Sequence, residues 1–211
     1  MSFLSMLLTM KNKPVYRALI ILPLLIFSVV SVSFAQESNK VGFNKAKSHW
    51  TILGGFGITH PGWGDTETRI EDVDLILQYG RFLSGEKGRS WYKTRHELLI
   101  EIPVYIVYKP ESAVMTGINF LSCWNFTASE EIIPYIFTGG GFMYTSLDEP
   151  GLGTDYNGNY QAGVGTHYFI KENTTIDFNY RYHHISNADT AEPNEPLNST
   201  KTFVGLSFFL D

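Results

Sequence analysis

Two residue types that can carry out acyl chemistry stand two positions apart late in the sequence, in the run His184-Ile185-Ser186-Asn187. Side chains at i and i+2 of a β-strand point to the same face, so the imidazole and the hydroxyl would lie side by side. An imidazole can accept the proton of a serine hydroxyl and thereby raise its nucleophilicity. Asn187 or nearby backbone N–H groups could stabilise the resulting oxyanion. The run therefore predicts nucleophilic attack by Ser186 on an acyl group.

The same residues also allow plainer roles. His-x-Ser is a weak motif by itself, and a histidine at the rim of a barrel often only hydrogen-bonds a loop. Metal binding by His183 and His184 is disfavoured because adjacent residues on a strand point to opposite faces. The other histidines form no cluster with the spacing of metal ligands; they are His49, His60, His96 and His167. We expect neither a metal nor a cofactor.

The elements that must position this pair are strands. Eight segments with turn signals between them are roughly residues 50–59, 72–82, 96–108, 114–126, 133–145, 158–170, 174–185 and 202–210. Most have the length of about 10 residues that a tilted strand needs to cross a bilayer. Strands of soluble proteins are typically about five or six residues long. The sequence therefore predicts an all-β fold, an eight-stranded antiparallel outer-membrane β-barrel.

Alternation along segment 174–185 indicates which face the pair occupies. One face carries Ile176, Phe178, Tyr180 and Tyr182, and the other carries Asp177, Asn179, Arg181 and His183. An apolar face opposite a charged face fits a barrel with lipid outside and a polar interior. A soluble barrel would alternate in the same way, but the strand lengths and an export signal favour the membrane. By parity, His184 and Ser186 face outward toward lipid, and His183 faces inward.

The first 35 residues are typical of a secretory signal peptide. Three basic residues precede an apolar run over 18–34, and Ser33-Phe34-Ala35 offers a cleavage site. The alternative is a retained membrane helix, because the apolar run approaches spanning length. We expect cleavage after Ala35 and a mature barrel over 36–211. No run in that mature part is long and apolar enough for a membrane helix.

Composition and charge limit which other classes of protein and how many domains the sequence can represent. Residues 1–35 hold three of the 16 basic residues and none of the 21 acidic ones, so the mature chain carries a charge of −8. A basic footprint for nucleic acid is therefore absent. One domain is expected at this length. The single cysteine, Cys123, cannot form an internal disulfide and is expected to be a small buried or lipid-facing group.

Connection lengths predict the orientation of the barrel. With a periplasmic N-terminus, the odd connections face the cell surface; these are 60–71, 109–113, 146–157 and 186–201. Three of them are long and rich in Gly, Pro, Asn and Asp, whereas two of the three even connections are short, as in outer-membrane barrels. The even connection 83–95 is long, and the sequence offers no reason for it. The apolar alternation of the final segment is similar to the terminal strand that the barrel-assembly machinery recognises.

The run His184-Ile-Ser186-Asn187-Ala188, followed by Pro193-Asn194 and a strand, resembles the lipid A deacylase family (PagL-like, often labelled acyloxyacyl hydrolase). The likeness extends to the signal peptide, to the strand count and to the glycine clusters at 139–141 and 163–165. The sharp motif covers about 20 residues, whereas the architectural likeness covers most of the mature chain.

The resemblance implies a carboxylic ester hydrolase of the outer membrane that removes the 3-O-linked acyl chain of lipid A. The implied partners are lipid A or lipopolysaccharide and outer-membrane lipid, with no cofactor. By this likeness His184 is the general base and Ser186 the nucleophile, and Asn187 and Asn194 help the oxyanion or the local geometry. The family's acid lies 12 positions after the serine, where this chain has Asn198. An asparagine can orient a histidine through its amide oxygen, and Glu192 or Glu195 could also serve.

Two functions without catalysis are kept as alternatives. One is a structural or adhesive surface barrel, or a family member that has lost activity. The other is a small pore or ligand carrier, which is disfavoured because eight strands leave an interior just filled by side chains. The choice of acyl chain and the formation of a homodimer are left open by the sequence.

Overall fold

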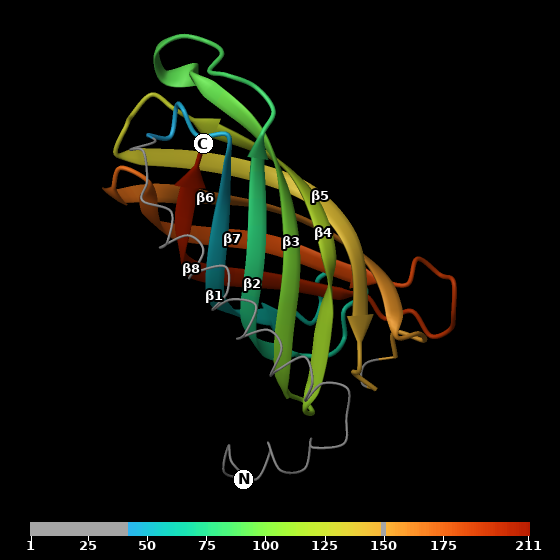
Figure 1. Ribbon diagram of the computed structural model, residues 1–211. Coiled ribbons are helices and arrows are strands. Elements are labelled where there is room, and N and C mark those ends of the chain that lie inside the picture. The colour runs from blue at the N-terminus through green and yellow to red at the C-terminus, as the bar shows by residue number, and fades with distance from the viewer. Residues whose placement is uncertain (1–41, 149–150) are drawn as a thin grey trace, which may run out of the picture. The chain divides into compact units, whose positions relative to one another are not determined.

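The strands of the computed structural model, which describes residues 42–148 and 151–211, form a closed antiparallel barrel in sequence order (Figure 1). The barrel closes where β1 pairs with β8. The elements are β1 (Ser48–Thr59), β2 (Glu71–Phe82), the 3₁₀ turn η1 (Ser90–Tyr92), β3 (Thr94–Lys109), β4 (Ala113–Phe126), β5 (Ile132–Thr145), β6 (Tyr156–Lys171), β7 (Thr174–Ser186) and β8 (Leu197–Leu210). No helix in the described ranges is long and apolar enough to cross a membrane.

The predicted eight-stranded antiparallel barrel is confirmed, and its strand bounds are close to those expected. The largest difference is β8, which begins at Leu197 rather than at residue 202. The sequence places residues 197–201 in the preceding connection, and four of these five residues are polar. The expected signal peptide, residues 1–35, lies outside the described residues.

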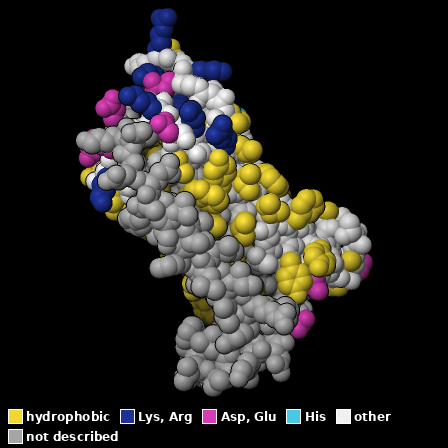
Figure 2. Space-filling view, in the orientation of Figure 1, with side chains coloured by type: hydrophobic (Ala, Val, Ile, Leu, Met, Phe, Trp, Pro, Cys, Tyr) yellow, Lys and Arg dark blue, Asp and Glu magenta, His cyan; other side chains and the backbone are white. Residues whose placement is uncertain are grey.

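The strands alternate between a polar interior and an apolar exterior. Along β7, Asp177, Arg181 and His183 are buried, whereas Phe178 and Tyr180 are about half exposed. Hydrophobic side chains cover the strands in the view of Figure 2, and lysines and arginines gather toward one end. This is the pattern of a barrel with lipid outside, and it is the reverse of a soluble barrel.

Charged side chains fill the interior in matched sets. Arg181 lies 3.0 Å from a carboxylate oxygen of Glu101, and Lys201 lies 2.6 Å from Asp72 and 2.9 Å from Asp74. These groups are almost fully buried, so each charge needs its partner inside the barrel. Gly57 makes room for the lysine set, because a Cβ there would lie 2.2 Å from Asp72 Oδ1.

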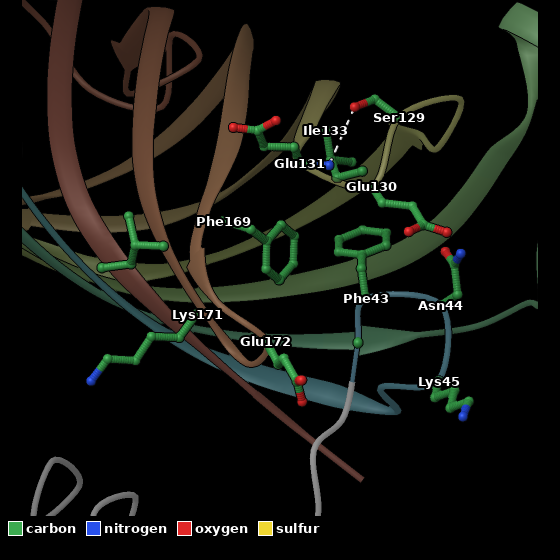
Figure 3. Close-up of a pocket in the computed structure, with 12 residues that line it drawn as sticks. Phe43, Asn44, Lys45, Ser129, Glu130, Glu131, Ile133, Phe169, Lys171 and Glu172 are labelled. Carbon is green, nitrogen blue, oxygen red and sulfur yellow. Dashed lines mark hydrogen bonds between the residues drawn. The ribbon is translucent and has the colours of Figure 1, made fainter.

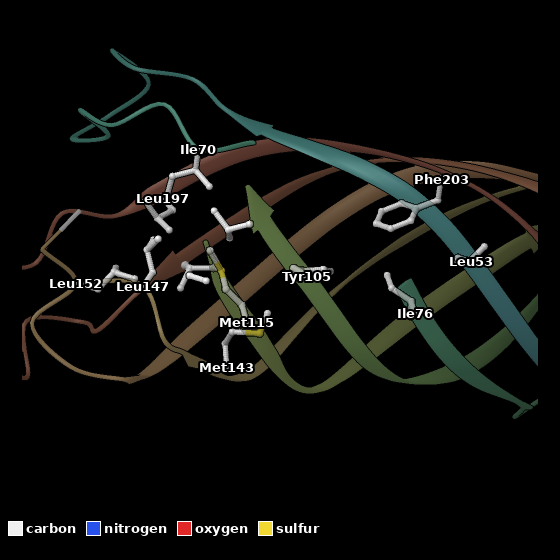
Figure 4. Close-up of a cluster of buried hydrophobic side chains, with 13 residues drawn as sticks. Leu53, Ile70, Ile76, Tyr105, Met115, Met143, Leu147, Leu152, Leu197 and Phe203 are labelled. Carbon is white, nitrogen blue, oxygen red and sulfur yellow. The ribbon is translucent and has the colours of Figure 1, made fainter. Parts of the chain in front are cut away.

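Apolar clusters close both ends of this polar interior. At one end lies a cluster that includes Ile70, Leu147, Leu152 and Leu197 (Figure 4). We call this end, with the connections 60–70, 110–112 and 187–196 and the described residues 146–148 and 151–155, the loop end. The opposite end, the turn end, holds a cluster of Phe43, Ala46, Phe82, Ile133 and Phe209. The barrel is therefore packed with side chains along its axis, as expected for eight strands.

The long connection 83–93 is a hairpin extension at the turn end (Figure 1). Lys87 pairs with Thr94 in an isolated antiparallel bridge, and η1 forms its tip. An ion pair of 3.2 Å between Lys93 and Glu86 braces it. Its length thus reflects local β structure that extends β2 and β3 beyond the barrel wall.

Candidate active site

The last residues of β7 carry the predicted base and nucleophile. His184 and Ser186 are partly exposed on the outer face of the barrel, whereas His183 and Ile185, the residues before and after His184, are buried in the interior. The alternation of β7 continues to its end, so the two side chains share one face. The pair lies next to the 187–196 connection at the loop end.

Asn198 stands directly across from His184 in the β7–β8 ladder. The Nδ1–H of His184 donates to Oδ1 of Asn198 over 2.7 Å. This contact exists because β8 begins at Leu197, which turns position 198 from a loop residue into a cross-strand neighbour. The remaining ring nitrogen, Nε2, then carries the lone pair and can act as a base.

Two tyrosines fix the imidazole further. The Tyr182 hydroxyl donates to the same Asn198 oxygen, and Tyr182 shares the outer face with His184 two positions later. Tyr160, across from His184 on β6, stacks on the imidazole with ring centroids 4.4 Å apart. Neither tyrosine is predicted in this role from the sequence, although the i−2 spacing of Tyr182 places it on the same face as His184.

The hydroxyl of Ser186 is held at the start of the loop. Its Oγ accepts the backbone N–H of Ala188 over 3.0 Å, and no hydrogen bond joins it to His184 in the described part of the chain. Catalytic hydrogen bonds are often long before substrate binds. Across the ladder stands Gly158, where an added Cβ would meet only the Ser186 carbonyl oxygen at 3.7 Å within a 4 Å radius. The space beside Ser186 on this face is therefore open.

Asn187 and Asn194 organise the loop after β7. The buried Asn187 amide donates to the carbonyl oxygens of Leu152, Ala191 and Pro193 over 2.6, 2.8 and 3.3 Å. The backbone N–H of Asn187 donates to Asn194 Oδ1 over 3.1 Å. These bonds occupy the donors of Asn187, so of the two expected roles the structure favours local geometry over direct oxyanion binding.

Glu195 and Glu192 lie in the same loop without reaching the imidazole. One carboxylate oxygen of Glu195 accepts the backbone N–H groups of Glu67 and Thr68 over 3.0 and 2.8 Å. Within the described ranges, neither glutamate is hydrogen-bonded to His184. Glu195 therefore ties the β7–β8 loop to the β1–β2 loop, and in the described structure Asn198 is the candidate partner that is hydrogen-bonded to His184.

A histidine and a serine are in direct contact elsewhere on the barrel. His96 Nε2 lies 2.7 Å from Ser122 Oγ, and the ring of Trp124 stacks on His96. These residues lie near the turn end, on β3 and β4. The pair supplies a comparison for the candidate site.

A cavity of about 590 Å³ lies at the turn end, far along the barrel from His184 (Figure 3). Phe43, Ile133 and Phe169 line it together with lysines and glutamates. Its serine, Ser129, accepts the backbone N–H of Glu131, and no histidine lines it. No group of three or more potential metal-ligating side chains occurs in the ranges that the structure describes.

Comparison with known proteins identifies the family to which this chain belongs. A family model described as lipid A 3-O-deacylase (PagL) matches residues 77–207. Among solved structures, the outer membrane enzyme PagL superposes with a TM-score of 0.51 at 16% identity, covering 75% of this chain and 97% of that one. Neisserial surface protein A superposes with a TM-score of 0.55 at 14% identity, covering 77% and 97%. No curated protein sequence matches this chain.

The solved structures of PagL and of Neisserial surface protein A share the fold of this chain. The family model reaches further, because it spans more than half of the chain, from β2 into β8. That span contains the run at His184 and Ser186 together with Asn198. The resemblance that this run suggested is confirmed: the chain is an outer-membrane β-barrel that belongs to the lipid A 3-O-deacylase (PagL) family.

Proposed function

We propose that this chain is an ester hydrolase that removes the 3-O-linked acyl chain from lipid A, with Ser186 as nucleophile and His184 as general base. The observation that carries the proposal is the hydrogen bond from His184 Nδ1–H to Asn198 Oδ1. It orients the imidazole and leaves Nε2 as the proton acceptor on the face that Ser186 shares.

The reaction would proceed in two balanced steps. Nε2 of His184 takes the Ser186 proton as Oγ attacks the ester carbonyl, and the C–O bond of the ester then breaks. The sugar alkoxide leaves with the proton from the imidazolium, and the acyl group stays on Ser186. Water then attacks this acyl-serine with the same base, releasing the fatty acid and restoring the hydroxyl.

Asn198 would orient the base without carrying charge, as an asparagine does in Cys-His-Asn proteases. Backbone donors near the nucleophile would stabilise the oxyanion. The nearest one is the N–H of Ala188, 3.0 Å from Ser186 Oγ. Asn194, whose Nδ2 gives one proton to Asp189 Oδ1, retains a second proton that could serve the same purpose.

The surroundings of the pair favour a lipid substrate. Tyr156, Tyr160 and Phe142 stand more than half exposed on the outer face near Ser186, and such a surface is stable against acyl chains rather than water. A nucleophile on this face meets molecules that lie in the membrane. Lipid A forms the outer leaflet at the cell surface, where the long loops are expected to lie.

Two further expectations accompany this function. Residues 1–35 would direct export and be removed, and the C-terminal strand β8 would be read by the barrel-assembly machinery. Both are tested by mass determination of the mature protein from an outer-membrane fraction.

Mass spectrometry of lipid A from expressing cells tests the function. Cells with the wild-type protein should lose one 3-O-linked acyl chain, and cells with Ser186→Ala should keep it. Ser122→Ala is the control, because Ser122 is a serine elsewhere on the barrel that is hydrogen-bonded to a histidine. Unchanged lipid A in cells that contain the folded wild-type barrel would refute the proposal.

A non-enzymatic surface barrel is the second candidate. It is favoured by the lack of a Ser186–His184 hydrogen bond in the described structure and by the engaged donors of Asn187. Under this alternative, any phenotype of expression would persist in the Ser186→Ala variant.

A further inference from the structure

The β1–β2 loop covers Asn198 on the outer face of the barrel. His60 Nε2 contacts Thr200 Oγ1 at 2.8 Å, and the His60 backbone N–H donates to the Asn198 carbonyl oxygen over 2.9 Å. Asn198 points outward by its position in β8, yet it is only 6% exposed because this loop lies over it. The loop is therefore part of the surroundings of His184.

The carbonyl oxygen of Trp63 determines which way the Asn198 amide faces. It lies 2.7 Å from Nδ2 of Asn198. A carbonyl oxygen can only accept a hydrogen bond, so the NH₂ side of the amide must face it. The opposite rotamer would place two acceptor oxygens against each other.

Thr66 is a second residue that constrains the Asn198 amide to the same orientation. Its hydroxyl donates to the carbonyl oxygen of Pro196 over 2.7 Å, which uses its only proton. The same oxygen must then act as the acceptor for the backbone N–H and for Nδ2 of Asn198, at 2.9 and 2.8 Å. Thr66 is 2% exposed, so water cannot replace these bonds readily.

From these contacts we infer that Thr66 and the Trp63 carbonyl form a cradle specific for an amide at position 198, and that Thr66 is a positioning residue for His184. With both protons of Nδ2 committed to the cradle, Oδ1 faces Tyr182 and His184. The cradle thereby fixes the imidazole tautomer with the proton on Nδ1. The catalytic consequence rests on the proposed function, but the tautomer does not.

The cradle excludes a carboxylate of the same shape. An aspartate at 198 would place an oxygen without a proton opposite the Trp63 carbonyl oxygen, where Nδ2 now lies at 2.7 Å. The two acceptors would repel each other, and the loop would have to move away. The site is thus built around a neutral orienting group.

Kinetics of purified, refolded variants on lipid A test the positioning role. Thr66→Val keeps the shape of the side chain and removes its hydroxyl, so kcat should fall about tenfold or more with KM little changed. Thr66→Ser should stay near wild type. Thr59→Val is the matched control, since Thr59 is a buried threonine at the base of the same loop that bonds Thr68 and Ile70.

Nitrogen-15 NMR of histidine-labelled protein in detergent gives a readout that needs no activity. The His184 signal, identified by its loss in His184→Gln, should show the Nδ1–H tautomer in wild type and in Thr59→Val. Thr66→Val should give a mixture of tautomers. Asn198→Asp should lower kcat and free the loop to proteolysis.

The results of these experiments distinguish a failure of the cradle from a failure of the proposed function. Wild-type kcat and an unchanged tautomer in a folded Thr66→Val barrel would overturn the cradle, as would an Asn198→Asp variant with full activity and a protected loop. If wild type shows no deacylation but the tautomer responds to Thr66→Val, the proposed function fails and the cradle stands.

Discussion

Tyr160 lies nearly face to face with His184, with ring centroids 4.4 Å apart and planes inclined by 24°. The two residues are a cross-strand pair of β6 and β7, so the backbone register itself brings the rings together. The stack restrains rotation of the imidazole, and the Asn198 hydrogen bond fixes its remaining freedom.

Removing this stack should reduce turnover. Tyr160→Leu is expected to lower kcat about fivefold to tenfold, because an aromatic pair is worth roughly 0.5–1.5 kcal/mol beyond its buried area. Tyr160→Phe keeps the ring and should remain near wild type. Steady-state kinetics on purified lipid A in detergent would show the difference, and equal kcat values for both variants would argue against a role of the stack.

Filling the space beside the nucleophile should block the substrate. Gly158 faces outward across from Ser186, and its position has room for a side chain. Gly158→Leu is therefore expected to fold and to lose about a hundredfold in kcat/KM, in line with the cost of misplacing reacting groups. A folded variant that retains activity would show that substrate approaches Ser186 from another side.

Loosening the β7–β8 loop should expose it to protease. Asn187→Ala removes three side-chain hydrogen bonds to loop carbonyls, leaving those acceptors short of partners at about 1–3 kcal/mol each. We expect faster cleavage between residues 188 and 195, measured by mass spectrometry of the fragments, together with lower activity. Asp189→Ala, which removes a more exposed bond to Asn194, should have the smaller effect on cleavage.

Breaking the interior ion pair should destabilise the whole barrel. Arg181→Met leaves the buried Glu101 carboxylate without its cation, which typically costs about 3–5 kcal/mol. The temperature at which the folded band disappears in unboiled gel electrophoresis should fall. Arg69→Met is the control, because Arg69 is exposed in its pair with Glu71; solvent screens such a pair, so the loss of stability should be small. Adding Glu101→Leu to Arg181→Met should restore part of the loss.

Alternation and segment length were sufficient to predict the strands, because each strand separates a polar interior from an apolar exterior at every second residue. The start of β8 was the exception. Residues 197–201 read as a loop, since Asn198, Thr200 and Lys201 are polar on both faces. The interior accepts Lys201 through Asp72 and Asp74, and a loop covers Asn198, so polarity there does not mark the end of a strand.

The sequence placed His184 and Ser186 on one face, because two-residue spacing is a local property of a strand. It offered three partners for His184 and could not choose among them, since the choice depends on cross-strand register. Thr66 lies 132 positions from Asn198, and no spacing rule connects the two. Only the closure of β1 onto β8 brings that loop to the site.

The closure of β1 onto β8 also determines when, during folding, the site becomes complete. The groups around His184 come from the first connection of the barrel and from its last three strands. During insertion into the membrane, the chain therefore contains Ser186 before the β1–β2 loop contacts Asn198 and sets the tautomer of His184. Under the proposed function, hydrolysis would begin only once the sheet has closed into a barrel, so lipids that the chain contacts during insertion would keep their acyl chains.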